Sequence, residues 1–389
     1  MSQPEDVTEQ LPSEILLHIL CLATADEGVR VDAYTERPLK VQKSSLYAIS
    51  AVCQQWRALN ENVPAWQRIV IDVSNSHGPA PQQPVQWREE YGALLRQVLE
   101  MRKRTGQALE VKCNIADQWP DDERDILESP ALTRLVQADI AWKAFEYVAS
   151  PFSSMDWVCE TLEFVRSKFG DWEYLGIDLE DGPFVEEYWS VKDLVGKMTD
   201  MPKLQRLALK LGWKGRWHWH SWSIWPSFPS LPVRELKLQA SEAVCVVMMK
   251  MCPQVSSVDI CVDGKEEDTL EKEEKAPDNG LDFAMMNLKT LGLIVMAGNA
   301  DFVQILTRME CPRLERFVFE WPSNTEAVAK QNGVGALECF VERPRNLALT
   351  GEVYLPYVRV KGIENWGLKR LTTAPRDYYS SRRGRPSFL

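Results

Sequence analysis

The sequence predicts an α+β protein, with a small helical unit at the N-terminus followed by an α/β repeat, an irregular solenoid of strands and helices. Apolar residues recur at three- and four-residue steps in the first 71 positions, which is typical of amphipathic helices. Further along, the template apolar-x-x-apolar-x-apolar recurs between positions 204 and 319. The chain has 389 residues, 45% hydrophobic and 26% charged, as in ordinary soluble globular proteins.

A first helix is predicted to open at Leu11-Pro12-Ser13-Glu14, because proline suits the first helical turn and an early acidic residue suits the positive end of the helix dipole. Its apolar residues are Ile15, Leu16, Ile19, Leu20, Leu22 and Ala23. They fall on two adjacent stripes. The apolar arc is therefore broader than packing against one neighbour requires.

A second helix is predicted after Ser44 or Ser45, either of which caps its start. Its apolar positions are Leu46, Ile49, Val52, Cys53, Trp56 and Leu59. A turn at 63–66 and a β-branched strand at 69–73 follow. Between the two helices lies an insertion, residues 24–43, which has mixed charge and no helical periodicity. Periodicity alone favours simple core packing of these helices.

The order of LPSEILLHIL, then VCQQWRAL, then Trp66 resembles the F-box, whose usual pattern is an LP-x-E-x-L-x-x-I opening, a V-C-(K/R)-x-W centre and a later tryptophan. The resemblance covers residues 11–71. It implies docking on a Skp-type adaptor, which bridges to a cullin and a RING subunit in a ubiquitin ligase. Many family members are shorter where this chain has residues 24–43, so this segment is either a harmless excursion or a change to the adaptor surface.

Carried over position by position, the resemblance assigns one set of residues to adaptor contact and the small core around it. These residues are Leu11, Pro12, Glu14, Ile15, Ile19, Leu20, Val52, Cys53, Trp56, Leu59 and Trp66.

The repeat template begins at positions 204, 233, 255, 288 and 314, so successive starts are 29, 22, 33 and 26 residues apart. Three copies are introduced by similar four-residue motifs: Met201-Pro202-Lys203-Leu204, Cys252-Pro253-Gln254-Val255 and Cys311-Pro312-Arg313-Leu314. Proline ends the preceding helix, and the apolar alternation starts a strand. Helices are expected at 243–251 and 301–309, and weaker template copies at 172–177 and 135–140. The region resembles the degenerate leucine-rich-repeat-like part of fungal F-box-like proteins, although the usual asparagine is missing.

The resulting domain prediction has five parts. Residues 1–10 are a disordered N-terminus, 11–71 the F-box-like helical domain, and 72–375 the leucine-rich-repeat-like solenoid with an acidic loop at 263–280. Residues 376–389 are a basic disordered tail. The tryptophans and histidines at 212–226 are either a recognition patch or a loop folded over the solenoid edge, and a metal site there would lack ligands.

In such a solenoid, alternate strand residues share one concave surface, here called the strand strip. Its candidate partner-binding residues are Arg206, Lys210, Glu235, Lys237, Gln239, Asp259, Arg316 and Glu320, with Ala208, Ser257 and Val318 between them. A merely solvated face would show the same mixed charge.

The function predicted is that of a non-catalytic substrate receptor in a Skp-cullin-F-box ubiquitin ligase, with an unknown target on the repeat region. Phosphate-binding, dinucleotide, zinc-protease, Gly-x-Ser-x-Gly and Cys-x-x-Cys motifs are absent from the sequence, which disfavours an enzyme. We expect no cofactor and no metal. A net charge of −11 disfavours nucleic acid. No apolar stretch approaches the roughly 20 residues of a membrane span, and the acidic, polar N-terminus is unlike a signal peptide, so an intracellular protein is expected. The alternatives are an interaction scaffold outside any ligase, and an enzyme with an unrecognised site near 212–226.

Overall fold

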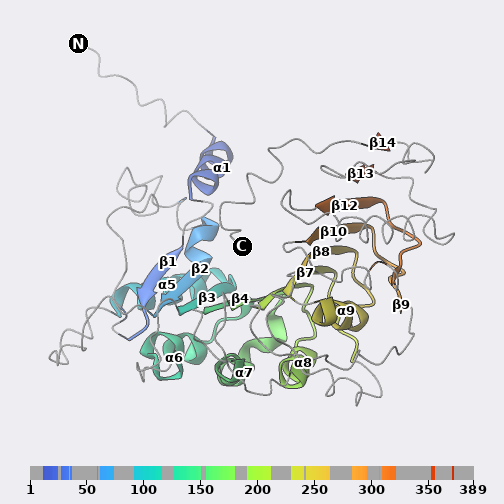
Figure 1. The fold of residues 1–389 in the computed structure, drawn as a ribbon. Coiled ribbons are helices and arrows are strands. Elements are labelled where there is room, and N and C mark those ends of the chain that lie inside the picture. Colours follow the sequence, from blue (N-terminus) through green and yellow to red (C-terminus); the bar gives the residue numbers. More distant parts are fainter. Residues whose placement is uncertain are drawn as a thin grey trace, which may run out of the picture. The chain divides into compact units, whose positions relative to one another are not determined.

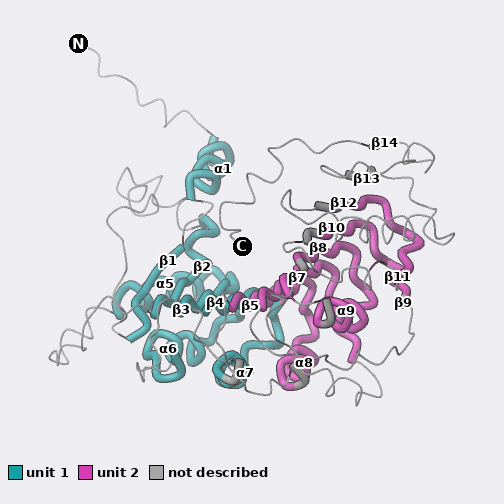
Figure 2. Tube along the Cα trace, in the orientation of Figure 1, with its two compact units in different colours: residues 1–172 teal, residues 173–389 magenta. Residues whose placement is uncertain are grey.

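The computed structural model of the chain divides into two compact units, residues 1–172 and residues 173–389 (Figure 2). The residues described are 12–24, 28–34, 36, 59, 62–73, 92–115, 126–149, 155–179, 191–211, 229–240, 242–262, 283–295, 306, 309–320, 352–354 and 370–371.

Unit 1 contains parallel strands that pair in chain order (Figure 1). They are β1 (Val29–Asp32), β2 (Arg68–Asp72), β3 (Leu109–Ile115) and β4 (Trp142–Ala149). Val29 lies opposite Ile69, Ile69 opposite Val111, and Val111 opposite Phe145. Parallel neighbours require crossover connections, and helices supply them between β2 and β4.

The helical elements that the structure delimits in unit 1 are α1 (Ser13–Ala23), η3 (Pro64–Gln67), α5 (Ala93–Thr105), η4 (Ile126–Glu128), α6 (Pro130–Gln137), α7 (Met155–Phe164) and η5 (Arg166–Asp171). Two of these helices have a clear local signal at one end. Helix α5 ends at Gly106, whose φ of 66° is the left-handed conformation that glycine adopts without strain. Helix α6 is capped at its start by Ser129, whose side chain accepts a hydrogen bond from the Leu132 N–H.

The core of unit 1 lies on one face of its sheet. Alternate strand residues on that face are buried: Val29, Val31, Ile69, Ile71, Leu109, Val111, Cys113, Ile115, Phe145, Tyr147 and Ala149. Aromatic rings extend this core, with Trp172 stacked on Phe145 at 4.9 Å and on Trp142 at 6.4 Å between ring centroids. Such aromatic contacts stabilise a core beyond the area they bury.

The insertion at 24–43 contributes a strand, which the sequence interpretation did not foresee. Strand β1 comes from its middle and pairs along β2. The carbonyl of Ala33 accepts hydrogen bonds from the Ser129 Oγ at 2.6 Å and the Ala131 N–H at 3.4 Å. Glu36 then forms a two-pronged ion pair with Arg134, at 2.7 and 3.1 Å. The described part of the insertion is therefore attached both to the sheet and to α6.

Unit 2 also places parallel strands in chain order. These strands are β5 (Tyr174–Leu179), β6 (Arg206–Leu211), β7 (Glu235–Ala240), β8 (Ser257–Val262), β10 (Thr290–Val295), β12 (Arg316–Glu320), β13 (Glu352–Tyr354) and β14 (Arg370–Leu371). Helix α8 (Val191–Thr199) precedes β6, and α9 (Glu242–Met251) connects β7 with β8. The short strands β9 (Phe283–Ala284) and β11 (Met309–Glu310) pair separately.

The strands predicted from the template at 204, 233, 255, 288 and 314 are confirmed as β6, β7, β8, β10 and β12. The first apolar residue of each copy lies just before its strand and is fully buried: Leu204, Val233, Val255, Leu288 and Leu314. In four copies, the N–H of this first apolar residue donates a hydrogen bond to the carbonyl three residues earlier, at 3.1 to 3.2 Å, which closes a turn. The template thus encodes a buried anchor followed by a strand, and the copy at 172–177 corresponds in the same way to β5.

The proposed copy at 135–140 is wrong, because Leu135 belongs to α6 and the strand begins later, at Trp142. Leu135 and Ile140 are buried, so their apolar character reflects core packing at a helix end. The helix predicted at 243–251 is confirmed as α9. Of the helix predicted at 301–309, Leu306 is helical and Met309 belongs to β11. The N-terminus, residues 44–58, the tryptophan-rich segment, the acidic loop and the tail lie outside the described residues.

Candidate functional site

Helix α1 starts and stops through local interactions. Pro12 occupies its N-cap, and the Leu16 N–H donates to the Pro12 carbonyl at 3.0 Å. Glu14 lies in the first turn, where a negative charge is favourable. At the other end, both the N–H and the hydroxyl of Thr24 donate to the Leu20 carbonyl, at 3.1 and 2.8 Å. Thr24 therefore caps the C-terminal end of α1.

The two apolar stripes of α1 have different environments. Leu16 and Leu20 are 1% exposed, so this stripe holds the helix to the protein. Ile15, Ile19 and Leu22 are 50%, 44% and 66% exposed and follow one another at i, i+4 and i+7. Large aliphatic side chains on one helix face are costly to leave in water, at roughly 25 cal/mol per Å². This second stripe, here called the α1 stripe, has the character of a docking surface.

The residues assigned to the adaptor separate into surface and core. Pro12, Glu14, Ile15 and Ile19 are exposed, whereas Leu20 and Trp66 are buried and Leu59 is half-buried. Leu11, Val52, Cys53 and Trp56 lie outside the described residues. Leu22 belongs to the α1 stripe but was absent from the predicted set, and its i+3 spacing from Ile19 is the signal that could have found it.

With this geometry established, comparison with known protein families gives one match. Residues 8–72 match the F-box-like family model. This segment is an F-box-like domain. The resemblance at 11–71 is thereby confirmed, and with it a role of this segment in protein–protein interaction. A search of curated proteins finds no match to the chain.

The F-box-like domain is structurally continuous with the rest of unit 1. Its final strand, β2, pairs with β3, which lies beyond the matched segment. Its inserted strand, β1, pairs with β2 on the other side. Gln67, next to β2, donates to the Gln107 side chain and accepts from Lys143, both at 3.3 Å. The domain thus shares its sheet and a polar network with later parts of the chain.

The strand strip lies on neighbouring strands in register. Arg206 is opposite Glu235, Lys237 is opposite Asp259, and Lys210 is opposite Gln239. Arg206, Glu235 and Lys237 are exposed, and Lys210, Gln239, Asp259 and Arg316 are half-buried. The Glu320 side chain lies outside the described residues, although its backbone belongs to β12.

Two residues expected between the charges of the strand strip are not on the surface. Ala208 is 4% and Val318 is 7% exposed. Both side chains are short, and each lies two residues along its strand from a long charged residue, Arg206 for Ala208 and Arg316 for Val318.

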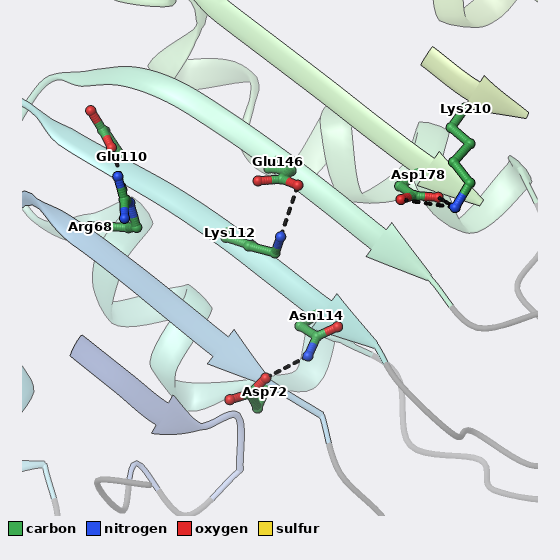
Figure 3. Close-up of polar contacts among 8 residues, drawn as sticks. All are labelled: Arg68, Asp72, Glu110, Lys112, Asn114, Glu146, Asp178 and Lys210. Carbon is green, nitrogen blue, oxygen red and sulfur yellow. Dashed lines mark hydrogen bonds and ion pairs between the residues drawn. The ribbon is translucent and has the colours of Figure 1, made fainter. Parts of the chain in front are cut away.

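Polar side chains also lie on the non-core face of the unit 1 sheet, which the sequence interpretation did not single out (Figure 3). Asp72 accepts two hydrogen bonds from Arg30, each 2.9 Å, and one from Asn114 at 2.7 Å. Lys112 lies 2.8 Å from the buried carboxylate of Glu146. These acids are engaged by basic or amide groups, and the charge-assisted contacts stabilise this face of the sheet.

The same pattern recurs elsewhere. Arg68 pairs with Glu110 at 3.5 Å in unit 1, and Lys210 pairs with Asp178 at 3.0 Å in unit 2 (Figure 3). The strand strip therefore contains at least one lysine that is already ion-paired within its own unit.

The described residues contain no group of three or more His, Cys, Asp or Glu side chains placed to hold a metal ion. Within the same part of the chain, no helix is long and apolar enough to cross a membrane. Burial raises the pKa of the Cys113, Cys252 and Cys311 thiols to about 12, so these thiols stay protonated and unreactive near neutral pH.

Proposed function

We propose that the protein is the substrate receptor of a Skp-cullin-F-box type ubiquitin ligase. The F-box-like domain docks on a Skp-type adaptor, which connects to the cullin and RING subunits, and unit 2 holds a target protein. The receptor supplies no catalytic group. It raises the rate of ubiquitin transfer by holding a target lysine near the charged ubiquitin carrier, so that a bimolecular encounter becomes effectively intramolecular.

The observation that carries this proposal is the α1 stripe inside the F-box-like domain. The same helix has one stripe buried by its own chain and a second stripe of three aliphatic residues left in water. A helix with these two surfaces is suited to lie between the body of the protein and a partner. Pro12 and Glu14, also exposed, extend the proposed adaptor surface to the start of the helix.

For the target side, we propose that residues 72–375 form a leucine-rich-repeat-like solenoid. Recurrent anchors and consecutive parallel strands in unit 2 support this interpretation. Repeats of this kind bury a continuous core only when stacked, and stacking leaves one extended strand face for a partner. The strand strip is that face. An intracellular location, in the cytoplasm or nucleus, follows from the proposed ligase partners.

The test is a calorimetric titration of the full chain with a purified Skp-type adaptor. Ile15→Ala combined with Ile19→Ala should weaken binding about thirtyfold or more, the equivalent of about 2 kcal/mol for anchor residues. The matched control is Phe164→Ala combined with Met286→Ala, which shortens exposed apolar side chains elsewhere and should leave the affinity unchanged. Folded wild-type protein that fails to bind the adaptor would overturn the proposal.

A second candidate is an interaction scaffold outside any ligase. It is favoured by β1, because the insertion that forms this strand lies inside the F-box-like domain. The two candidates differ in what co-purifies with the protein. A scaffold would recover its unit 2 partner without the adaptor or the cullin.

A further inference from the structure

The N-terminal ends of five strands in unit 2 form a basic edge on a protein whose net charge is negative. We define this basic edge as the five tetrapeptides that lead into β6, β7, β8, β10 and β12, namely residues 203–206, 232–235, 254–257, 287–290 and 313–316. Its basic residues are Lys203, Arg206, Arg234, Lys289, Arg313 and Arg316, and its acidic residues are Glu235 and Glu315. Six bases against two acids give a local net charge of +4, whereas the whole chain carries −11.

The backbone aligns these tetrapeptides from one strand to the next. The N–H groups of Arg234 and Glu235 both donate to the Gln205 carbonyl, and those of Ser256 and Ser257 both donate to the Arg234 carbonyl. Ser256 in turn accepts from residues 289 and 290, and Lys289 accepts from residues 315 and 316. The same pattern at each junction holds the five tetrapeptides in one row, so their side chains are at regular positions.

The length of this row of tetrapeptides matches that of a short extended peptide. Strands β6, β7, β8, β10 and β12 are consecutive neighbours, so the row crosses four gaps of about 4.8 Å, or about 19 Å. An extended peptide advances about 3.3 Å per residue, so about six residues span this distance.

Most of the basic groups of this edge are accessible to a ligand. Arg206, Arg234, Lys289 and Arg313 are exposed. The Lys289 ammonium is 3.3 Å from Glu315, but their side chains are 57% and 64% exposed, so water screens this pair and a ligand carboxylate can compete for the lysine. Arg206 lies over the Tyr174 ring at 5.3 Å, which orients its guanidinium without neutralising the charge.

We propose that the basic edge binds an extended acidic segment of a partner protein. Resting on the proposed receptor function, this surface would select targets that carry a run of Asp or Glu. The basic stretch begins at β6, because Glu173 precedes β5, and its length fits a short segment of about six residues. Nucleic acid is a poorer fit, because its phosphates repeat without interruption, whereas Glu235 and Glu315 interrupt the basic row.

The probe is a fluorescein-labelled decapeptide of alternating glutamate and serine, titrated with the full chain and followed by fluorescence anisotropy. Arg234→Gln, Lys289→Gln and Arg313→Gln together should weaken binding about tenfold, because each exposed charge contact contributes a factor of about two to three. Raising the salt from about 50 to 200 mM should also weaken binding by the wild type.

The matched control removes three exposed basic groups from unit 1, through Lys103→Gln, Arg104→Gln and Arg166→Gln. Both triple variants change the net charge equally, and circular dichroism checks that each is folded. An equal loss in the two triple variants, or equal binding of a glutamine-serine decapeptide, would overturn the proposal. So would tighter binding of a ten-residue oligothymidine than of the acidic peptide.

This outcome is separable from adaptor docking. The basic-edge variant should bind the Skp-type adaptor with wild-type affinity, because none of its substitutions lies in residues 8–72. Loss of peptide binding with intact adaptor binding supports the proposal, and failure of the adaptor titration alone leaves the peptide result standing.

Discussion

Because Ser129 attaches the inserted strand to α6, the substitution Ser129→Ala should lower the free energy of unfolding by an amount that can be calculated from its contacts. The Ser129 hydroxyl is fully buried and has two roles. It donates to the Ala33 carbonyl at 2.6 Å, next to β1, and it accepts from the Leu132 N–H at 3.2 Å as the N-cap of α6. Loss of the N-cap costs about 1 kcal/mol, and loss of a buried hydrogen bond costs about 1 kcal/mol more. The free energy of unfolding of unit 1 should therefore fall by about 2 kcal/mol.

The assay is urea denaturation of the full chain combined with hydrogen exchange at the β1 amides. Exchange should accelerate at Val29–Asp32 in Ser129→Ala, because the adjacent carbonyl loses its short hydrogen bond. The control is Ser256→Ala. Its hydroxyl also donates to a carbonyl, that of Arg234 at 3.2 Å, but in contact with water, so its loss should cost less than about 0.5 kcal/mol. Equal losses in the two variants, or unchanged exchange at β1, would refute the reasoning.

Two further predictions concern α1 and the buried thiols. Leu16→Ala should lower the free energy of unfolding by about 3 kcal/mol and Ile15→Ala by less than about 1 kcal/mol, because only the first side chain is buried, and chemical denaturation would distinguish them. Cys113, Cys252 and Cys311 should resist iodoacetamide at pH 8 until the chain unfolds. Since unfolding returns their raised pKa values to near 9.0, the unfolded state loses protons first and the free energy of unfolding should decrease between about pH 9 and 12. Rapid modification of all three in folded protein, or flat stability over that range, would contradict this account.

Local signals were sufficient to predict parts of both units. The start of α1 at Pro12 and the strands after Leu204, Val255 and Leu314 depend on interactions within a few residues. The breadth of the apolar arc also predicted that α1 has more apolar surface than one neighbour covers, and the exposure of Ile15 agrees. Periodicity and turn chemistry report such short-range interactions directly.

The elements that were missed depend on distant partners. Strand β1 has four residues, and what identifies it is the pairing of Val29 with Ile69, forty positions later. Strand β3 does show alternating apolar residues from Leu109 to Ile115, so local pattern is sufficient to predict this strand. The copy at 135–140 was misassigned because Leu135 is apolar as a buried residue of helix α6 and does not belong to a strand. Which carboxylates meet which bases, such as Lys112 with Glu146, is set by strand register and cannot be found from local pattern.

The central claim is that the F-box-like domain connects this protein to a ligase, and the most direct measurement is affinity purification of the full chain from cells followed by detection of the adaptor and the cullin. The account predicts that both are recovered with the wild type and that both are lost with Ile15→Ala/Ile19→Ala, while binding of the acidic peptide is retained. Recovery of a unit 2 partner without either ligase subunit would contradict the account and support the scaffold.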